Sequence, residues 1–146
     1  MKIKNSLLVL AALVTLGGLA GCGKTSYFEV ALYVDSNVPG VNATCLFKLN
    51  QCEVMVKGAG GESFTLNSSV CHAPTGYNLG VFQYATDEES GDVSFHVMLT
   101  ANVDGVPTNV GSGDSTPTPI KSGMRQQVAV TVKPDVAALK CNTQTQ

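Results

Sequence analysis

Five cysteines, Cys22, Cys45, Cys52, Cys71 and Cys141, are the side chains of this 146-residue chain best suited to chemistry. Thiols of exported proteins pair as disulfides, so an odd number leaves one cysteine for another use. If Cys22 has that use, four candidates remain, and they allow three pairings. We predict that Cys45–Cys52 closes a local hairpin and that Cys71–Cys141 ties down the tail. The longer loop would stabilise the fold more, by about 4 kcal/mol on the chain-entropy model.

The two histidines, His72 and His96, do not fall in a recognisable ligand pattern. Cys71-His72 lacks the first cysteine of a C-x-x-C-H haem-attachment motif, because Ser68 stands in its place. Cysteines engaged in disulfides cannot serve as the thiolate ligands of a metal site. His96 lies on the polar face of a predicted strand, which favours a solvated side chain. The sequence therefore predicts no metal and no cofactor.

Carboxylates gather in one place, residues 87–92, with the sequence DEESGD. Alternating acids followed by glycine resemble part of a calcium loop, but the full spacing and the distal Glu are missing. We interpret this segment as a solvated turn between strands. The chain has no Gly-x-Ser-x-Gly elbow, and the glycines of residues 58–61 indicate a turn rather than a phosphate loop. These patterns predict a protein that is not an enzyme.

The first twenty residues have the organisation of a secretory signal. Residues 1–5 carry Lys2 and Lys4, and residues 7–20 are apolar apart from Thr15. A helix that spans a bilayer needs roughly 20 apolar residues, so this run is short for a permanent anchor. A basic start, a short apolar core and small residues at its end are typical of a cleaved signal peptide.

Leu19-Ala20-Gly21-Cys22 follows this apolar run and resembles the lipobox of bacterial lipoproteins, with no departure from the motif. The resemblance covers residues 1–22 only. It implies that residues 1–21 are removed as a lipoprotein signal peptide and that Leu19, Ala20 and Gly21 are recognition positions. It also implies that Cys22 carries the lipid on its thiol and new amino group. Two or three acyl chains hold a protein stably on a bilayer.

The residues after Cys22 predict where the protein lies. Gly23, in place of an Asp, resembles the pattern of lipoproteins sent to the outer membrane in enterobacterial-type cells. Residues 22–26 form a short linker, so the domain should lie close to the bilayer within the cell envelope. Loss of Lys2 and Lys4 leaves 7 basic against 11 acidic side chains, a formal charge of −4. This balance, without a basic block, argues against both nucleic acid and anionic lipid headgroups as partners.

Alternating apolar and polar residues predict strands along the rest of the chain. Residues 92–100 give the most regular example, followed by an Asp104-Gly105 hairpin turn. Pro107 suggests that the next strand lies at an edge. We place a second hairpin at Asn50-Gln51. The predicted strands are residues 27–34, 44–49, 52–57, 62–66, 79–85, 92–100, 106–110 and 126–133.

Seven or eight strands at spacings near ten residues favour an all-β domain over residues 27–141, an antiparallel β-sandwich, with residues 142–146 as a polar tail. The stretch 81–133 resembles the later half of an immunoglobulin-like or fibronectin-III-like domain. The chain has no Trp, so the buried Trp of immunoglobulin domains is missing. A transthyretin-like sandwich or a small barrel fits the pattern as well.

The sequence favours a non-enzymatic structural or protein-binding role in the cell envelope. The bilayer would be one partner, through acylated Cys22, and another envelope protein the second. The edge strand 106–110 and a loop at 111–119 are the candidate contacts, because sheet edges accept partner strands. One alternative is a glycan- or peptidoglycan-binding module, with Tyr27 and Tyr33 on one strand face. A second alternative is an inhibitor of an envelope enzyme.

Overall fold

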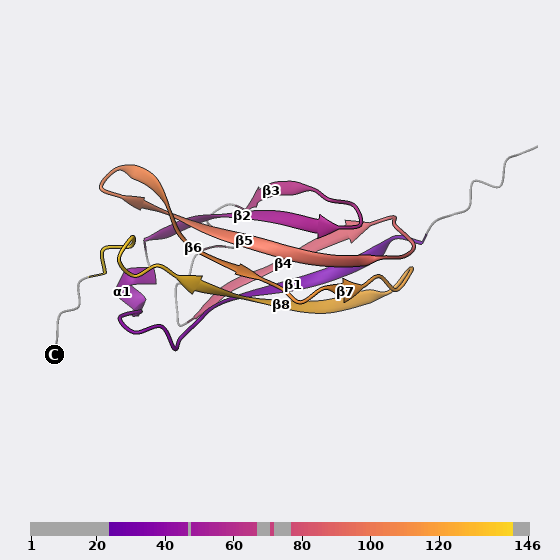
Figure 1. Cartoon of the computed structure of the whole chain (residues 1–146), viewed down its shortest axis with the longest axis horizontal. Coiled ribbons are helices and arrows are strands. Elements are labelled where there is room, and N and C mark those ends of the chain that lie inside the picture. The colour runs from indigo at the N-terminus through magenta and orange to yellow at the C-terminus, as the bar shows by residue number, and fades with distance from the viewer. Residues whose placement is uncertain (1–23, 47, 67–70, 72–76, 142–146) are drawn as a thin grey trace, which may run out of the picture.

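A computed structural model of the chain describes residues 24–46, 48–66, 71 and 77–141 (Figure 1). The proposed signal peptide, with Leu19, Ala20, Gly21 and Cys22, lies outside the described residues, as do His72 and the tail 142–146. The described elements are β1 (Ser26–Val34), α1 (Ala43–Leu46), β2 (Leu49–Gly58), β3 (Ser63–Leu66), β4 (Asn78–Thr86), β5 (Asp92–Val103), β6 (Val106–Asp114), β7 (Thr118–Pro119) and β8 (Arg125–Pro134).

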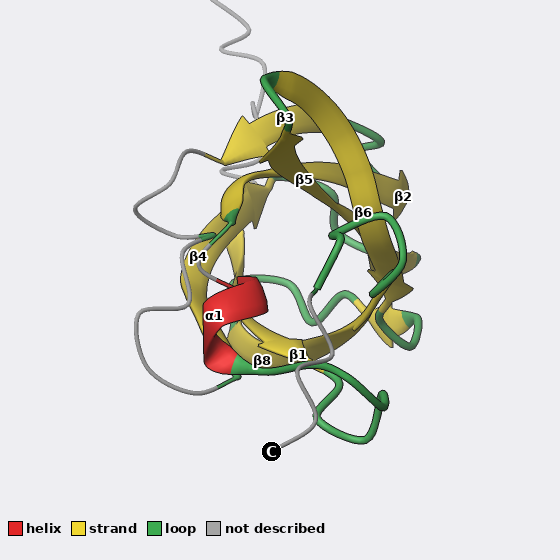
Figure 2. Ribbon diagram, turned by 90° about the vertical axis from the view of Figure 1, so that its left-hand side faces the viewer, coloured by secondary structure: helices red, strands yellow, loops and turns green. Residues whose placement is uncertain are grey.

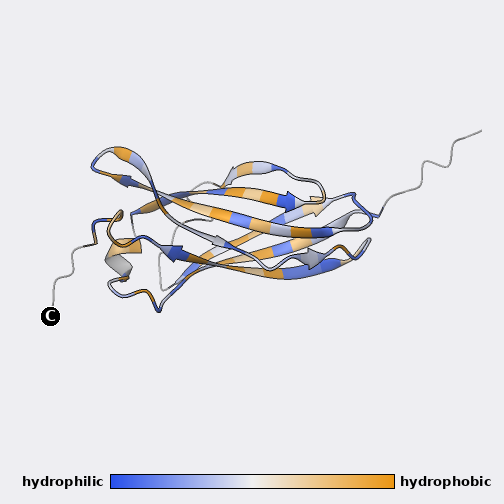
Figure 3. Cartoon of the chain, in the orientation of Figure 1, coloured by the Kyte–Doolittle hydropathy of each residue, from blue (hydrophilic) through white to orange (hydrophobic). Residues whose placement is uncertain are grey.

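The all-β prediction is confirmed. Hydrophobic and hydrophilic residues alternate along the strands (Figure 3), and buried and exposed residues alternate with them. In β1, Phe28, Val30 and Leu32 are fully buried, while the residues between them face outward. Successive side chains of a strand point to opposite faces, so one face of each strand covers the core. The same pattern in β5 and β8 matches the faces predicted from the sequence.

The strands form one curled sheet in the order β3-β2-β5-β6-β8-β1-β4, with β7 paired to β5. The sheet is mixed rather than purely antiparallel, because β1 and β8 pair in parallel. Figure 2 shows how the sheet curls, so that β1, β4 and β8 lie across the core from β2, β3 and β5. The first and last long strands of the chain are thus neighbours, which fixes both at the centre of one half of the sheet.

An aromatic cluster fills the space between the two halves of the sheet. Phe95 of β5 packs edge-on against Phe28, Phe82 and Tyr84, with ring centroids 5.6–6.0 Å apart. Phe64 of β3 packs edge-on against Phe82 of β4 at 5.6 Å. The two ends of the curled sheet therefore meet through side chains, and the described residues of β3 and β4 do not pair with each other.

The hairpin predicted at Asn50-Gln51 is wrong. Residues 43–46 form the single turn α1, and β2 runs unbroken from Leu49 through this dipeptide to Gly58. The side-chain amide oxygen of Asn42 accepts a hydrogen bond of 2.9 Å from the Cys45 N–H, so Asn42 caps the turn. The polar pair lies at a bulge, since the register with β5 shifts between Leu49 and Gln51.

The loop predicted at 111–119 is also wrong, because only residues 115–117 of this range lie outside the strands. β6 continues to Asp114, and the short strand β7 occupies residues 118 and 119. Glycines extend β6 here because it passes very close to β8. A Cβ on Gly113 would lie 2.3 Å from the Thr131 carbonyl oxygen, closer than any real contact. The Gly-Ser-Gly run is thus a strand segment in which Gly111 and Gly113 have no side chain where the two backbones meet.

The two described disulfides confirm that Cys45, Cys52, Cys71 and Cys141 pair with one another, but the predicted pairing is wrong. Cys45 bonds to Cys141 and Cys52 bonds to Cys71. Cys45 lies in α1 and Cys52 in β2, so the two do not face each other across a hairpin. The short link therefore joins β2 to the segment after β3, and the long link joins α1 to the C-terminal turn.

The molecule is elongated, and its two ends differ (Figure 1). The N-terminal end holds Lys24, the start of β1 and the turns before β5 and β8. The far end holds α1, the β5–β6 hairpin and the C-terminal turn of residues 135–141. Since a strand rises about 3.3 Å per residue, nine-residue β1 separates these ends by about 30 Å.

Candidate functional site

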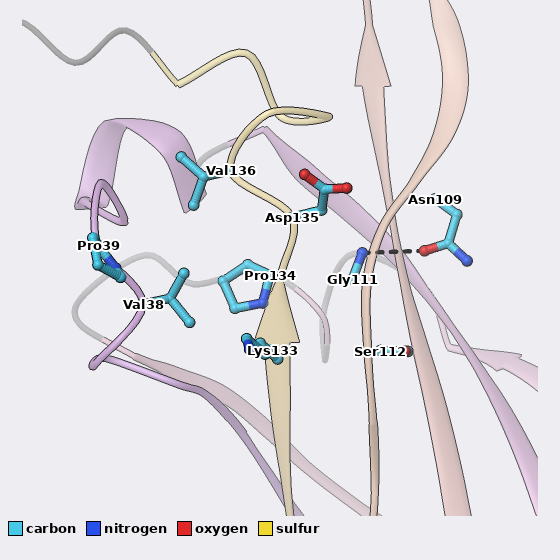
Figure 4. Close-up of a pocket in the computed structure, with 9 residues that line it drawn as sticks. All are labelled: Val38, Pro39, Asn109, Gly111, Ser112, Lys133, Pro134, Asp135 and Val136. Carbon is cyan, nitrogen blue, oxygen red and sulfur yellow. Dashed lines mark hydrogen bonds between the residues drawn. The ribbon is translucent and has the colours of Figure 1, made fainter.

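An open groove of about 790 Å³ lies at the far end, where β6 and β8 separate (Figure 4). β6 pairs with β8 at Gly111–Pro134 and Ser112–Lys133, and β8 ends at Pro134, whereas β6 extends past this point toward Val106. The C-terminal turn and the loop before α1 supply the other walls. The lining residues are Val38, Pro39, Asn109, Gly111, Ser112, Lys133, Pro134, Asp135 and Val136.

The groove is apolar along the loop and turn walls, and its polar groups are largely held in place. The amide oxygen of Asn109 accepts a hydrogen bond of 3.1 Å from the Gly111 N–H. The Asp135 N–H donates to the Val110 carbonyl at 2.7 Å, which joins the turn to β6. One Asp135 carboxylate oxygen accepts from the Ala138 N–H at 2.9 Å. The groove therefore has a fixed shape and two charged residues, Lys133 and Asp135, in its lining.

The first residues of β6 have a strand neighbour on one side only. β6 lies inside the sheet order, so Pro107 is not on an edge strand, yet residues 106–109 extend past β8 and pair only with β5. In a two-residue hairpin, Val103 and Val106 form the hydrogen-bonded pair, so the backbones of Pro107 and Asn109 point away from β5. Pro107 has no N–H, which leaves this short edge few bonds to offer.

The β5–β6 hairpin itself is tightly built, as predicted. Asp104 and Gly105 adopt φ angles of 54° and 85°, the left-handed pair that a type I′ turn needs. The Lys140 ammonium donates to the Asp104 carboxylate, and this hydrogen bond holds the pKa of Asp104 below its usual value. Val106, beside the turn, is 61% exposed. The hairpin tip is thus a rigid, partly apolar projection next to the groove.

His96 lies on the outer face of β5, as the sequence predicts, but it has partners. Its Nδ1 lies 2.9 Å from an Asp114 carboxylate oxygen, which also accepts from the Lys57 ammonium at 3.1 Å. The hydrogen bond from His96, and then that from Lys57, hold the pKa of Asp114 below its usual value. Within the described part of the chain, no hydrogen bond joins this imidazole to a serine, so the pair lacks the nucleophile of a triad.

Tyr27 and Tyr33 share the outer face of β1, as predicted, with 42% and 40% of their surface exposed. They are six residues apart on one strand, so their Cα atoms are separated by about 20 Å. One sugar ring cannot stack on both. Tyr84 belongs to the core, where burial raises its pKa and the charge of Glu62 raises it further. The tyrosines therefore do not form a joint stacking platform.

The acidic segment at 87–92 forms the turn between β4 and β5, as predicted. The Asp87 carboxylate accepts a hydrogen bond of 2.7 Å from the Thr25 hydroxyl, which fixes the chain just before β1. Among the residues that the structure describes, no group of three His, Cys, Asp or Glu side chains is arranged to hold a metal ion. No helix within those residues is long and apolar enough to cross a membrane.

Sequence patterns alone missed the groove, because its walls come from three segments that lie far apart in the sequence. Strand alternation located the free part of β6, but the walls at Val38 and Val136 depend on how the C-terminal turn folds back. No family model, no curated protein and no solved structure matches this chain.

Proposed function

We propose that this protein is a lipid-anchored, non-enzymatic protein of the cell envelope that binds another envelope protein through the groove at its far end. One observation carries the proposal: the groove and the chain's N-terminal end lie at opposite ends of a rigid domain. A lipid on Cys22, two residues before Lys24, lies within about 7 Å of the first described residue, because consecutive Cα atoms are 3.8 Å apart. The groove then faces away from the bilayer.

A polypeptide is the occupant that fits the groove best. Val38, Pro39, Pro134 and Val136 provide apolar contacts, and the backbone of Asn109 offers an N–H and a C=O to an added strand. Residues 106–109 of β6 offer few unpaired backbone groups, so we expect side-chain contacts to contribute more to binding than strand addition does. The volume falls in the range of ligand pockets, roughly 300–1,000 Å³, but the open shape suits a chain segment rather than an enclosed small molecule.

Crosslinking in living cells tests the binding role. A photo-crosslinking residue at exposed Pro39, inside the groove, should form a saturable adduct with one protein. The same residue at Gln83, which is exposed on the outer face of β4, should not. Equal adducts from both positions would mean that the groove is not the binding surface.

A matched pair of charge substitutions gives the control. Val38→Glu places a carboxylate in the groove, and Val81→Glu places one on an exposed valine of β4. We expect the Pro39 adduct to disappear with the first change and to persist with the second. The intact mass of the purified protein tests the anchor separately: it should show acyl chains, and Cys22→Ser should remove them. A mature protein without acyl mass would refute the anchor.

A further inference from the structure

A turn at the N-terminal end combines exposed basic and apolar side chains, and we name it the basic turn. It comprises residues 121–125, together with Lys24 and Tyr27, which lie against it. Met124 is 54% exposed, and Arg125 lies beside Tyr27 on the outer face because these two residues are register partners of β8 and β1. Lys24, Lys121 and Arg125 are exposed, and within the described residues none of the three lies within ion-pair distance of a carboxylate.

Hydrogen bonds hold the basic turn rigidly. The buried Ser26 hydroxyl donates to the Lys121 carbonyl at 3.3 Å and accepts from the Gly123 N–H at 3.1 Å. The Tyr27 N–H donates to the Met124 carbonyl at 3.0 Å. The side chain of Lys24 lies over Gly123, where a Cβ would approach it to 2.8 Å. The exposed methionine is therefore presented by a fixed frame rather than by a loose loop.

Charge is divided between the two sides of this end. The basic turn leads into β8 on one side of β1, and Asp87, Glu88 and Glu89 follow β4 on its other side. The two turns meet where the Ile120 N–H donates to the Gly91 carbonyl at 2.8 Å. Basic side chains near an anionic lipid surface gain about 1 kcal/mol each, and acidic ones are repelled. A domain tied to the bilayer two residues before Lys24 therefore tilts toward its β8 side.

We infer that the basic turn rests on anionic phospholipid headgroups and sets a fixed tilt of the domain on the membrane. The inference rests on the proposed lipid anchor, because the tether places the turn at the surface. Met124 then enters the boundary between headgroups and acyl chains, and Tyr27 lies at headgroup depth. The acidic turn is lifted from the bilayer, and the groove points away at an angle.

Single tryptophan probes test this tilt, because the chain contains no Trp. The full-length lipidated protein, in vesicles of phosphatidylcholine and phosphatidylglycerol with brominated acyl chains, carries Met124→Trp, Ser90→Trp or Val106→Trp. We expect quenching of the probe at Met124 at least twice that of the probe at Ser90, which lies in the acidic turn. The probe at Val106, at the far end, should not be quenched.

A matched pair on β8 tests the role of charge. Arg125→Glu, at the N-terminal end of the strand, should lower the population of the contacting state at least fivefold in the Met124→Trp protein. Lys133→Glu, at the far end, should leave quenching unchanged.

Equal quenching at Met124 and Ser90 would overturn the tilt while leaving the anchor intact. No quenching at Met124 in a protein whose mass shows the acyl chains would overturn the membrane contact alone. A protein without acyl chains would overturn both the anchor and the inference. In vesicles made of phosphatidylcholine alone, which have no net headgroup charge, we expect quenching of the probe at Met124 to be lost.

Discussion

Removing the Cys45–Cys141 disulfide should destabilise the protein more than removing Cys52–Cys71. The two bonds close loops of very different length, since their sequence separations are 96 and 19 residues. On the chain-entropy model, restricting the unfolded chain stabilises the fold by about 4.7 kcal/mol for the longer loop and by about 3.2 kcal/mol for the shorter. The difference of about 1.5 kcal/mol corresponds to about tenfold in the unfolding equilibrium.

Urea unfolding of two double variants measures this difference. Cys45→Ala with Cys141→Ala and Cys52→Ala with Cys71→Ala should each lower the midpoint by at least about 1 M, given slopes of about 1–3 kcal/mol per M. The first variant should have the lower midpoint. Equal midpoints, or the reverse order, would show that native packing around the bonds outweighs loop entropy. Cys52 and Cys71 are fully buried, so a reversed order would point to their packing.

The pairing itself can be read from one non-reducing digest. Cleavage after lysine and arginine places each of the four cysteines in a different peptide, because Lys48, Lys57 and Lys140 separate them. The structure predicts a link between the peptides holding Cys45 and Cys141. A link between the peptides 25–48 and 49–57 would instead restore the pairing predicted from the sequence and would contradict the structure.

Two further predictions concern β6. Gly113→Ala should lower the free energy of unfolding by about 1–3 kcal/mol, because the new Cβ would meet the Thr131 carbonyl. Urea unfolding measures this change, and Gly61→Ala, whose Cβ would lie 3.6 Å from the nearest atom, is the control. Asp114→Asn should cost stability at about pH 5, because the hydrogen bonds from His96 and Lys57 lower the pKa of Asp114 in the folded state. The stability difference between the two proteins should shrink as the pH falls below about 3.9, the pKa of Asp in an unfolded chain. If the unfolding midpoints of the two proteins differ by the same amount at every pH from 3 to 7, the prediction is contradicted.

Local alternation predicted the strands that bury one face, because that signal depends only on neighbouring residues. β1, β5 and β8 are found within a few residues of their predicted bounds for this reason. The two dipeptides interpreted as turns had different outcomes. Asp104-Gly105 forms one, whereas Asn50-Gln51 forms a bulge, because only the partner strand decides whether two polar residues end a strand or distort it.

The errors in β6 and in the disulfides have a common cause. Glycines are poor strand formers, so 111–113 was predicted as loop, but the close passage of β8 is what requires them. Likewise, Cys141 lies beside Cys45 only because the chain turns back after β8 and brings residues 135–141 to α1. Contacts between segments so far apart in sequence leave no periodic pattern to read.

The proposed binding groove depends on the same long-range contact. Its wall at Pro134, Asp135 and Val136 is continuous with the C-terminal turn, which is tied to α1 by the Cys45–Cys141 bond. The Lys48 ammonium also donates to the carbonyls of Leu139 and Lys140 at 2.9 and 3.0 Å.

The two hydrogen bonds from Lys48 are exposed or partly exposed, so on their own they hold the turn only weakly. The Cys45–Cys141 disulfide holds it more firmly, but this bond persists only in an oxidising compartment. If the groove binds a protein, its C-terminal wall is therefore fixed only after export, when the Cys45–Cys141 disulfide has formed. The variant with Cys45→Ala and Cys141→Ala should stay lipidated and folded at its N-terminal end, yet lose the groove adduct. An adduct of unchanged yield from that variant would show that the turn holds its place without the disulfide, and that binding is independent of the redox state of the compartment.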